Sequence, residues 1–342
     1  TLTGSTATIR CTSPLGQRIL SRRLDSISTD SSLQAGVVTT RSSRGRRKMF
    51  TPAEFGKVSV LVPENGGAVP YGNTVVVHGS ESTLVIDPSL SLDRDPVGAD
   101  LVFVSHGHED HIAGLRHFDT PAYAHHLDAP AVASLDTMLT NYGLPPNERV
   151  EVQQSIATQY GIPPTHENVS GIAGGHVFDL GDRPATVIHL PGHTRGHCGV
   201  LVEPDGFFYV ADIDLTSFGP MYGDLGSSVN DFLDSIDHVA TIDARWYGTF
   251  HQKGVVEGSD EFRRRLSAYR DKLLSREDRL IQFLGEPKLL EDIVAHRLVY
   301  RPHVSAPYVD AVERRTAQLH LERLIASGAV TVDEDKVFRR TL

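Results

Sequence analysis

Short apolar runs separated by polar turns extend over most of the chain, and apolar residues recur at helical spacing near its C-terminal end. Runs rich in Val, Ile, Phe and Tyr that are bounded by Gly, Asn, Pro or Asp predict β-strands. The run Leu101–Val104 is apolar throughout, as expected of a strand that is buried on both faces. The predicted strands lie at residues 57–63, 74–77, 82–87, 101–104, 185–190, 199–203, 207–211 and 245–250.

The remaining segments have patterns that predict helices. Residues 227–242 place several apolar side chains on one face, with Ser227 as a candidate N-cap. Residues 112–118 are expected to open a helix, and residues 131–160 to hold a helix and a polar loop around Pro145-Pro146. Near the C-terminal end the pattern predicts helices at residues 259–284, 289–300 and 307–327, then a hairpin of residues 329–332 and 336–338.

These patterns divide the chain into three parts. Residues 1–48 are rich in Ser, Thr and Arg with little apolar periodicity, and we expect them to be disordered, either as a targeting segment or as upstream sequence. Residues 49–258 carry the strand-rich pattern and are expected to form one large α/β domain. Residues 259–342 are expected to form a helical, winged-helix-like appendage, because helices are followed there by a hairpin.

Four potential metal ligands lie within six residues directly after Leu101–Val104, in the stretch His106-Gly107-His108-Glu109-Asp110-His111. A strand that ends in such a cluster holds imidazoles and carboxylates on a short, rigid turn. A catalytic metal site needs such fixed nitrogen and oxygen donors around an ion, with one position left open for water. The spacing therefore predicts a hydrolytic metal site.

Three further donors follow predicted strands. His193 follows residues 185–190, Asp212 follows residues 207–211, and His251 follows residues 245–250. Strand ends meet at one edge of the sheets in layered α/β proteins, so these side chains are expected to converge on the first cluster. Seven donors suit two ions that share one bridging carboxylate.

The seven donors, in this order and spacing, resemble those of the metallo-β-lactamase fold superfamily, in its glyoxalase II-like and lactonase-like branch. The resemblance covers roughly residues 57–251 and implies an α/β fold, an αββα sandwich with two metal ions at one edge. It implies that one ion is held by His106, His108 and His193, and the other by Asp110, His111 and His251, with Asp212 bridging them. The helical tail is similar to that of β-lactamase-like proteins with a C-terminal winged helix.

The composition and charge of the chain limit the classes of partner that it is expected to bind. The net charge is −10, but residues 1–48 have nine basic and two acidic residues, which leaves 24 basic and 41 acidic residues, or −17, for the rest. An acidic body argues against a general nucleic-acid surface, because phosphate binding depends on Lys and Arg.

No apolar run reaches membrane-spanning length. With Cys11 and Cys198 as the only cysteines, we expect the cytoplasm, or an organelle if residues 1–48 target the chain. The oligomeric state is left open.

We therefore expect a metal-dependent hydrolase that cleaves a small ester, thioester or lactone. Zinc is the expected metal, and iron and manganese also suit the mixed donor set. Asp110 is the candidate catalytic residue, because its carboxylate can orient the nucleophile or accept its proton. Two alternatives stay open: an endoribonuclease or other phosphodiesterase of the same fold, and a non-catalytic metal-binding regulator.

Several other polar residues have both a functional and a structural interpretation. Asp87 ends a strand and either supports the site or forms a turn, and His189 and His197 either orient the neighbouring His193 or have ordinary structural roles. Tyr222 either lines the substrate pocket or packs in the interior.

Overall fold

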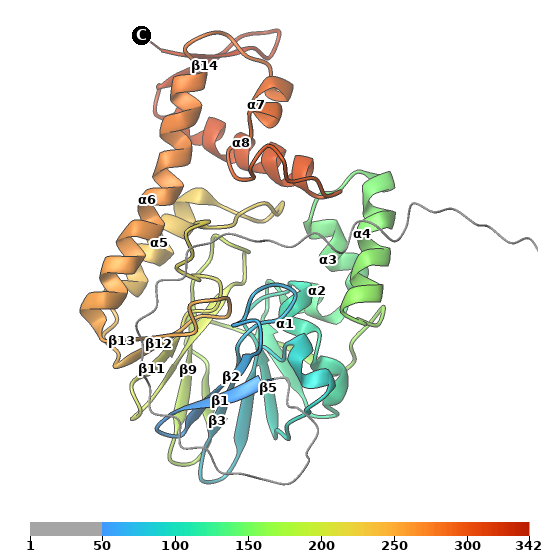
Figure 1. Ribbon diagram of the computed structural model, residues 1–342, viewed down its shortest axis with the longest axis vertical. Helices are drawn as coiled ribbons and strands as arrows, with labels where there is room; N and C mark the ends of the chain where they lie inside the picture. The colour runs from blue at the N-terminus through green and yellow to red at the C-terminus, as the bar shows by residue number, and fades with distance from the viewer. Residues whose placement is uncertain (1–49, 342) are drawn as a thin grey trace, which may run out of the picture. The chain divides into compact units, whose positions relative to one another are not determined.

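Two β-sheets lie face to face at the centre of the computed structural model, which describes residues 50–341 (Figure 1). The expectations for residues 1–48, including Cys11, lie outside the described residues. Residues 50–341 belong to one compact unit. The expected division of this unit at residue 258 stays a prediction.

The first sheet has the strand order β1-β2-β3-β4-β5-β6-β7. The strands from β1 to β4 pair antiparallel, and those from β4 to β7 pair parallel. Their bounds are Phe50–Phe55 (β1), Val58–Pro63 (β2), Thr74–His78 (β3), Thr83–Ile86 (β4), Leu101–Val104 (β5), Ala122–His125 (β6) and Val169–Ile172 (β7).

The second sheet has the order β13-β12-β11-β10-β9-β8, with one parallel pair between β11 and β12. Its strands are Val177–Asp179 (β8), Pro184–His189 (β9), Cys198–Val202 (β10), Phe207–Tyr209 (β11), Trp246–Gly248 (β12) and Val255–Glu257 (β13).

Successive side chains of a strand point to opposite faces of its sheet, which separates the core between the sheets from the layers of helices outside them. In β11, Phe207 and Tyr209 face the core between the sheets, whereas Phe208 faces the helices behind the second sheet. In β5, Phe103 faces the same core and Val102 packs against helices behind the first sheet. This follows from the two-residue period of a strand, and it explains why runs buried on both faces contain few polar residues.

Helices cover the outer faces of both sheets (Figure 1). The expected αββα sandwich is therefore confirmed. The first sheet is covered by α2 (Ala129–Ala133), α3 (Leu135–Asn141) and α4 (Pro146–Gln159), with α1 (Glu109–Ile112) and the 3-10 helices η1 (Leu90–Asp93) and η2 (Leu115–His117) nearby. The second is covered by α5 (Val229–Val239) and α6 (Ser259–Phe283). No helix among residues 50–341 is both long and apolar enough to cross a membrane.

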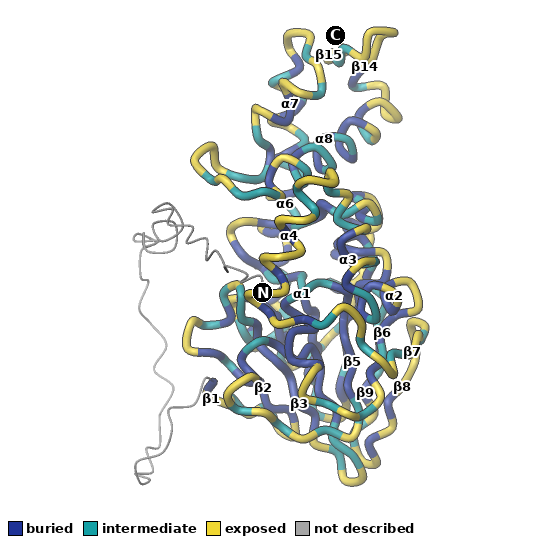
Figure 2. Tube along the Cα trace, turned by 90° about the vertical axis from the view of Figure 1, so that its right-hand side faces the viewer, coloured by how far each residue is buried: buried dark blue, intermediate teal, exposed yellow. Residues whose placement is uncertain are grey.

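The helices α6, α7 (Leu290–His296) and α8 (Val309–Ala326) precede a hairpin of β14 (Val330–Val332) and β15 (Phe338–Arg340). Figure 1 shows α6 running from beside the second sheet into this C-terminal region, where Figure 2 shows both buried and exposed residues. The buried residues of α6 recur every three or four positions, which makes one continuous stripe. They are Phe262, Leu266, Tyr269, Leu273, Arg276 and Leu280.

Two predicted helices differ from the structure. The expected helix of residues 112–118 begins earlier, at Glu109, and ends at Ile112. It stops there because the backbone N–H of Gly114 donates to the carbonyl of Pro88 at 2.8 Å, which draws the chain away from the helical path. The helix expected at residues 289–300 ends at His296, because Arg297 has a positive φ of 62°.

The loop predicted around Pro145-Pro146 is present at residues 142–145 and includes Pro145, but its extension to Pro146 is wrong. Pro146 is the first residue of α4, a position where the fixed φ of proline suits the helix and its missing N–H is not needed. The N-cap of α5 is Ser228, whose hydroxyl accepts the N–H of Asp231, and not Ser227. Five short strands were not predicted: β1, β6, β7, β8 and β13.

We predict that Phe262→Ala lowers the free energy of unfolding by about 3–5 kcal/mol. The Phe262 ring is fully buried and stacks on Tyr247 of β12, with ring centroids 3.8 Å apart, so its loss leaves a cavity between α6 and the second sheet. Urea denaturation measures the change. Asp271→Ala, at an exposed position of the same helix, is the control. A loss below about 1 kcal/mol for Phe262→Ala would contradict the role given to this contact.

Candidate metal centre

The seven predicted donors all lie after the ends of strands, at the same edge of the sandwich. His106 and His108 follow β5, and Asp110 and His111 lie in the short helix α1. The other three, His193, Asp212 and His251, follow β9, β11 and β12. The structure brings all seven together in two adjoining groups.

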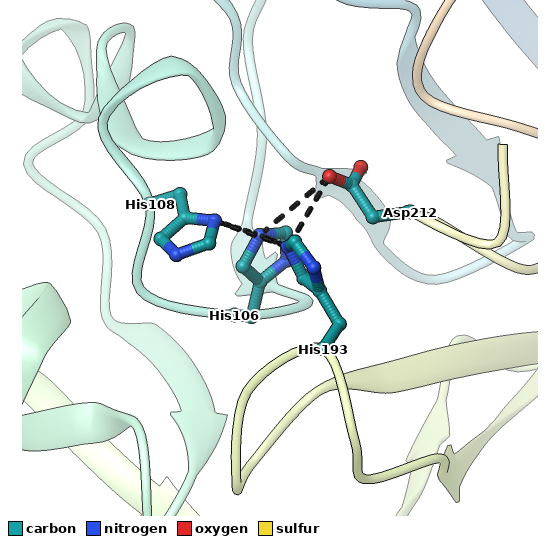
Figure 3. Close-up of side chains that lie close together, drawn as sticks. All are labelled: His106, His108, His193 and Asp212. Atoms are coloured by element: carbon teal, nitrogen blue, oxygen red, sulfur yellow. Dashed lines mark hydrogen bonds and ion pairs between the residues drawn. The ribbon is translucent and has the colours of Figure 1, made fainter. Parts of the chain in front are cut away.

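The first group contains His106, His108, His193 and Asp212 (Figure 3). The Nε2 atom of His106 lies 2.9 Å from Nδ1 of His108 and 3.1 Å from Nε2 of His193. Nδ1 of His108 and Nε2 of His193 are also 3.1 Å apart. The carboxylate oxygen Oδ2 of Asp212 lies 3.3 Å from Nε2 of His193. Three nitrogens and one oxygen thus surround a single point.

The second group contains Asp110, His111 and His251. Oδ2 of Asp110 lies 3.1 Å from Nε2 of His251, and Oδ1 lies 3.8 Å from Nε2 of His111. The other oxygen of Asp212, Oδ1, lies 3.1 Å from Nε2 of His111 and 3.9 Å from Nε2 of His251. Asp212 therefore presents one oxygen to each group.

The outward-facing nitrogen of each histidine has a hydrogen-bond acceptor, which fixes the tautomer. Nδ1 of His193 donates to the carbonyl of Met221 at 2.8 Å, and Nδ1 of His251 donates to the carbonyl of Gly67 at 3.1 Å. Nε2 of His108 donates to Asp224 at 2.9 Å. Each of these rings therefore turns an unprotonated nitrogen toward the centre in its neutral form.

Asp87 and Ser105 fix the other two rings in the same way. Asp87 is fully buried and accepts hydrogen bonds from Nδ1 of His111 at 2.8 Å, the hydroxyl of Ser105 at 2.6 Å and the hydroxyl of Tyr209 at 2.7 Å. Since the Ser105 hydroxyl gives its proton to Asp87, its oxygen accepts from Nδ1 of His106 at 3.0 Å. The supporting role of Asp87 is the interpretation that the geometry favours.

Five imidazole lone pairs and two carboxylates facing one another repel, unless cations lie between them. Nε2 of His111 and Oδ1 of Asp212 illustrate this, because both are buried, lie 3.1 Å apart and have no hydrogen-bond partner among the described residues. Buried polar atoms normally have a partner. Imidazole nitrogens and carboxylate oxygens are common ligands of zinc and related ions, so this donor set fits divalent metals.

Without a metal, the pKa values divide the donors into two classes: that of His106 is lowered, whereas neighbouring carboxylates raise those of His108, His111 and His251 against the effect of burial. Burial and the neighbouring His111 hold the pKa of His106 well below its usual value, so its ring stays neutral. Burial disfavours charge on Asp212 too, but His111 and His251 keep its pKa well below the usual range. Although burial opposes it, Asp224 raises the pKa of His108 to about 9, and Asp212 and Asp110 raise that of His251 to about 9. Metal binding at these two rings therefore displaces protons.

A second buried carboxylate, Asp128, ties together the loops that carry the histidines. Its Oδ2 accepts from the hydroxyl of Thr194 at 2.5 Å and from the N–H of Gly107 at 3.3 Å, while Oδ1 accepts from the N–H of Gly196 at 2.8 Å. Gly107 lies between His106 and His108, and Thr194 follows His193. Asp128 thus sets the distance between the two loops of the first group.

The backbone of Asp212 is held from both sides. Nε2 of His197 accepts its N–H at 3.2 Å, while Nδ1 of His197 donates to the carbonyl of Leu190 at 2.9 Å. The hydroxyl of Tyr269 in α6 donates to the carbonyl of Asp212 at 3.0 Å. Ala211 just before it has a positive φ of 47°, an uncommon backbone conformation for alanine. His197 therefore orients Asp212 and not His193.

A cavity of about 420 Å³ opens onto both groups of donors. Part of its wall comes from the C-terminal region, through Tyr300, Tyr308 and Val312. Among the described residues that line it, none is Lys or Arg. Its aromatic lining residues are Tyr142, Tyr160, Phe218, Tyr300 and Tyr308, and its acidic ones are Glu109, Asp110, Asp212, Asp214 and Asp224. Tyr222 is buried, and its hydroxyl lies 2.9 Å from His320, so it packs in the interior.

Comparison with known proteins identifies the family. The model of the metallo-beta-lactamase superfamily matches residues 67–251, more than half of the chain. The chain belongs to this superfamily. The family expected from the seven donors is confirmed, and the match spans every one of them.

The matched relatives with a named activity are hydrolases, in agreement with the expected enzyme class. Acyl-coenzyme A thioesterase MBLAC2 of Bos taurus is 34% identical over 145 residues, which cover 36% of this chain and 51% of that protein. A hydroxyacylglutathione hydrolase of Shewanella loihica is 30% identical over 132 residues, covering 39% of this chain and 40% of that protein. The chain thus spans about half the length, or less, of these curated relatives.

The fold also agrees with a solved member. A beta-lactamase domain protein from Burkholderia ambifaria has a TM-score of 0.65 and 15% sequence identity, covering 87% of this chain and 97% of that one. At this identity the likeness concerns the fold alone.

The sequence pointed to Asp87 and His197 but not to other residues that orient the donors. Asp128 and Asp224 lie in segments without a strand or helix pattern, and their partners are distant in sequence. Arg276 had a signal, because it occupies a position of the apolar stripe of α6 where a hydrophobic residue is expected. A charged residue at a buried position of a stripe is a sign of a specific polar contact.

We predict that Asp224→Ala weakens the binding of divalent metal by about 10- to 100-fold, because His108 then loses the acceptor that fixes its tautomer. Competition for Zn²⁺ with a chromophoric chelator measures the affinity. Asp231→Ala, at an exposed site in α5, is the matched control and should bind as the wild type does. Equal affinity in both variants would show that Asp224 does not orient a ligand.

Proposed function

We propose that the protein is a metal-dependent hydrolase that cleaves a thioester or ester of an apolar acyl group. The observation that carries the proposal is the convergence of the inward-facing donor atoms at a cavity whose wall includes five Phe and Tyr side chains and no Lys or Arg among the described residues. The proposal joins the donor set, which suits water activation, to a cavity that suits an uncharged, apolar group.

The proposed ligand assignment follows the distances. His106, His108 and His193 would hold the first ion, and Asp110, His111 and His251 the second, with Asp212 between them. Zinc is the proposed metal, with iron and manganese as alternatives that the same donors suit.

Divalent ions bound there would supply an activated water near neutral pH and polarise the acyl carbonyl. The side chains of the protein would position the water and the substrate for this reaction. Asp110 lines the cavity and has an oxygen 3.1 Å from His251, so we propose that its carboxylate orients the attacking water or takes its proton. Its pKa lies below the usual value because, although burial opposes ionisation, His111 and His251 favour it, so Asp110 is ionised and can accept a hydrogen bond from the water.

The cavity favours a neutral substrate over a phosphodiester. Its lining has acidic residues and, among those described, no Lys or Arg to neutralise phosphates. A volume of about 420 Å³ lies in the range of small-molecule sites and accommodates an acyl group rather than a folded nucleic acid. We propose that a charged carrier, such as the coenzyme A of the named thioesterase relative, stays outside the aromatic part of the cavity.

We predict that His106→Ala and Asp212→Ala each lower hydrolysis of acyl thioesters by more than about 100-fold while the chain remains folded. His106 contributes to the first group and Asp212 to both, so either change removes donors that no neighbour replaces. The assay is thiol release from short, medium and long acyl thioesters, next to lactones and single-stranded RNA. Circular dichroism checks folding.

The same panel separates the alternatives. RNA cleavage that His106→Ala abolishes, without hydrolysis of any ester, thioester or lactone, would replace this proposal by the phosphodiesterase. Metal binding without hydrolysis of any member of the panel would favour the regulator.

Removing the metal should also lower stability. We predict that a chelator lowers the melting temperature of the wild type, and that Zn²⁺ restores it, because an ion at 100 times its Kd stabilises the folded state by about 2.7 kcal/mol. Asp212→Ala, which lacks the proposed bridge, should show a smaller shift. Differential scanning calorimetry with and without the chelator measures both, and identical melting curves for the wild type would count against a resident metal.

A further inference from the structure

A segment between Asp212 and α5, residues 216–228, lies between the metal centre and the C-terminal helices, and we call it the strap. On its inner side the carbonyl of Met221 accepts Nδ1 of His193, and the carboxylate of Asp224 accepts Nε2 of His108. The hydroxyl of Ser227 also donates to the carbonyl of His193 at 2.7 Å. The strap therefore orients two of the three histidines of the first group.

On its outer side the strap is held by Arg276 of α6. The guanidinium donates to the carbonyl of Phe218 at 2.9 Å and to the carbonyl of Pro220, the residue just before Met221. Its Cζ also lies 5.7 Å from the ring centroid of Phe218 and 5.3 Å from that of Tyr222. Two backbone carbonyls that flank one residue are thus held by one rigid, planar group.

The environment of Arg276 is unusual for a charged residue. Its side chain is only 2% exposed, and no carboxylate of the described residues lies within ion-pair distance of it. Arginine is rarely buried without an acidic partner, because its charge loses hydration. Leu or Met would continue the apolar stripe of α6 at this position without that cost, so the contacts with the strap are what compensate for the burial of the arginine.

The strap approaches the C-terminal helices closely at two glycines. A Cβ at Gly219, where φ is 85°, would lie 2.4 Å from the Lys272 side chain, and one at Gly223 would lie 2.8 Å from Val312 of α8. Nε and Nη2 of Arg315 in α8 donate to the carbonyls of Asp224 and Leu225, each at 3.3 Å. The strap is thus seated against both α6 and α8, with Arg276 at the point nearest Met221.

We propose that Arg276 is a positioning residue for the first ion: by fixing the carbonyls on either side of Gly219, it aims the carbonyl of Met221 at His193. The inference rests on the proposed metal function and deepens it. Through Tyr269, two turns earlier on the same face, α6 also holds the carbonyl of Asp212. One helix of the C-terminal region thereby sets both a histidine and the carboxylate of the first group.

The alternative role of Arg276 is simple cohesion between α6 and the strap. The two roles differ in what a substitution changes. Cohesion alone affects the stability of the folded chain and leaves the affinity of the metal-loaded site intact. A positioning role affects the binding of one ion, and it depends on the presence of the His193 ring that Met221 orients.

The test is Zn²⁺ and Co²⁺ binding by the full chain in Arg276→Met, which keeps an unbranched side chain but removes the donors. We expect about tenfold weaker binding of one of two ions, at the low end of the effect of lost outer contacts, and a changed Co²⁺ absorption spectrum. Arg276→Lys retains the charge but not the planar pair of donors, and should fall between Arg276→Met and the wild type. It carries the test if Arg276→Met does not fold. Arg264→Met, which is exposed and pairs with Glu261 on α6, is the control and should bind both ions normally.

A double-mutant cycle with His193→Ala decides between the two roles. We expect the tenfold effect of Arg276→Met to fall below about threefold when the His193 ring is absent, because coupled residues act non-additively. An unchanged affinity in both Arg276 variants, or an equal loss with and without His193, overturns the inference. If the wild type binds no metal, the proposed function itself fails; if it binds two ions and hydrolyses thioesters while the Arg276 variants match it, only this inference fails.

Discussion

The outward-facing nitrogens of the five donor histidines are the constraint on which this structure depends. Each donates a proton to an acceptor that the fold supplies: a serine hydroxyl, a carboxylate or a backbone carbonyl. Each neutral ring must then present a bare lone pair to the same small volume, where two carboxylates also point. Such an arrangement is unfavourable by itself and favourable around cations, so the surrounding hydrogen bonds favour a cation-binding centre.

The sheets and the C-terminal helices contribute to this arrangement in different ways. The strand ends β5, β9, β11 and β12 bring the donors to one edge, and buried carboxylates fix the loops between them. The C-terminal helices act from outside: α6 reaches Asp212 through Tyr269 and the strap through Arg276, and the loop from α7 to α8 supplies part of the cavity wall. Residues outside the family match of 67–251 thus shape the centre and the space above it.

The sequence predicted most strands of the sheets and the convergence of the donors from local patterns, and it predicted the sandwich from the resemblance of the seven donors to a known family. A buried strand such as Leu101–Val104 needs apolar residues in succession, and ligands on one turn, from His106 to His111, need fixed spacing. The hydrogen bonds that orient the donors do not follow any regular spacing in the sequence. Asp128 meets Thr194 across 66 positions, and His108 meets Asp224 across 116, so only the folded chain brings these pairs together. The cavity could not be predicted for the same reason.

The proposed bridging position of Asp212 is the central claim, because one carboxylate oxygen of this residue faces each group of donors. Anomalous diffraction from crystals of the full chain grown with Zn²⁺ tests it most directly. The account predicts two peaks per chain, one beside Oδ2 of Asp212 within reach of His106, His108 and His193, and one beside Oδ1 within reach of Asp110, His111 and His251. A fully loaded crystal with no zinc peak at Asp212, or with a single peak that Asp212 does not contact, would contradict it.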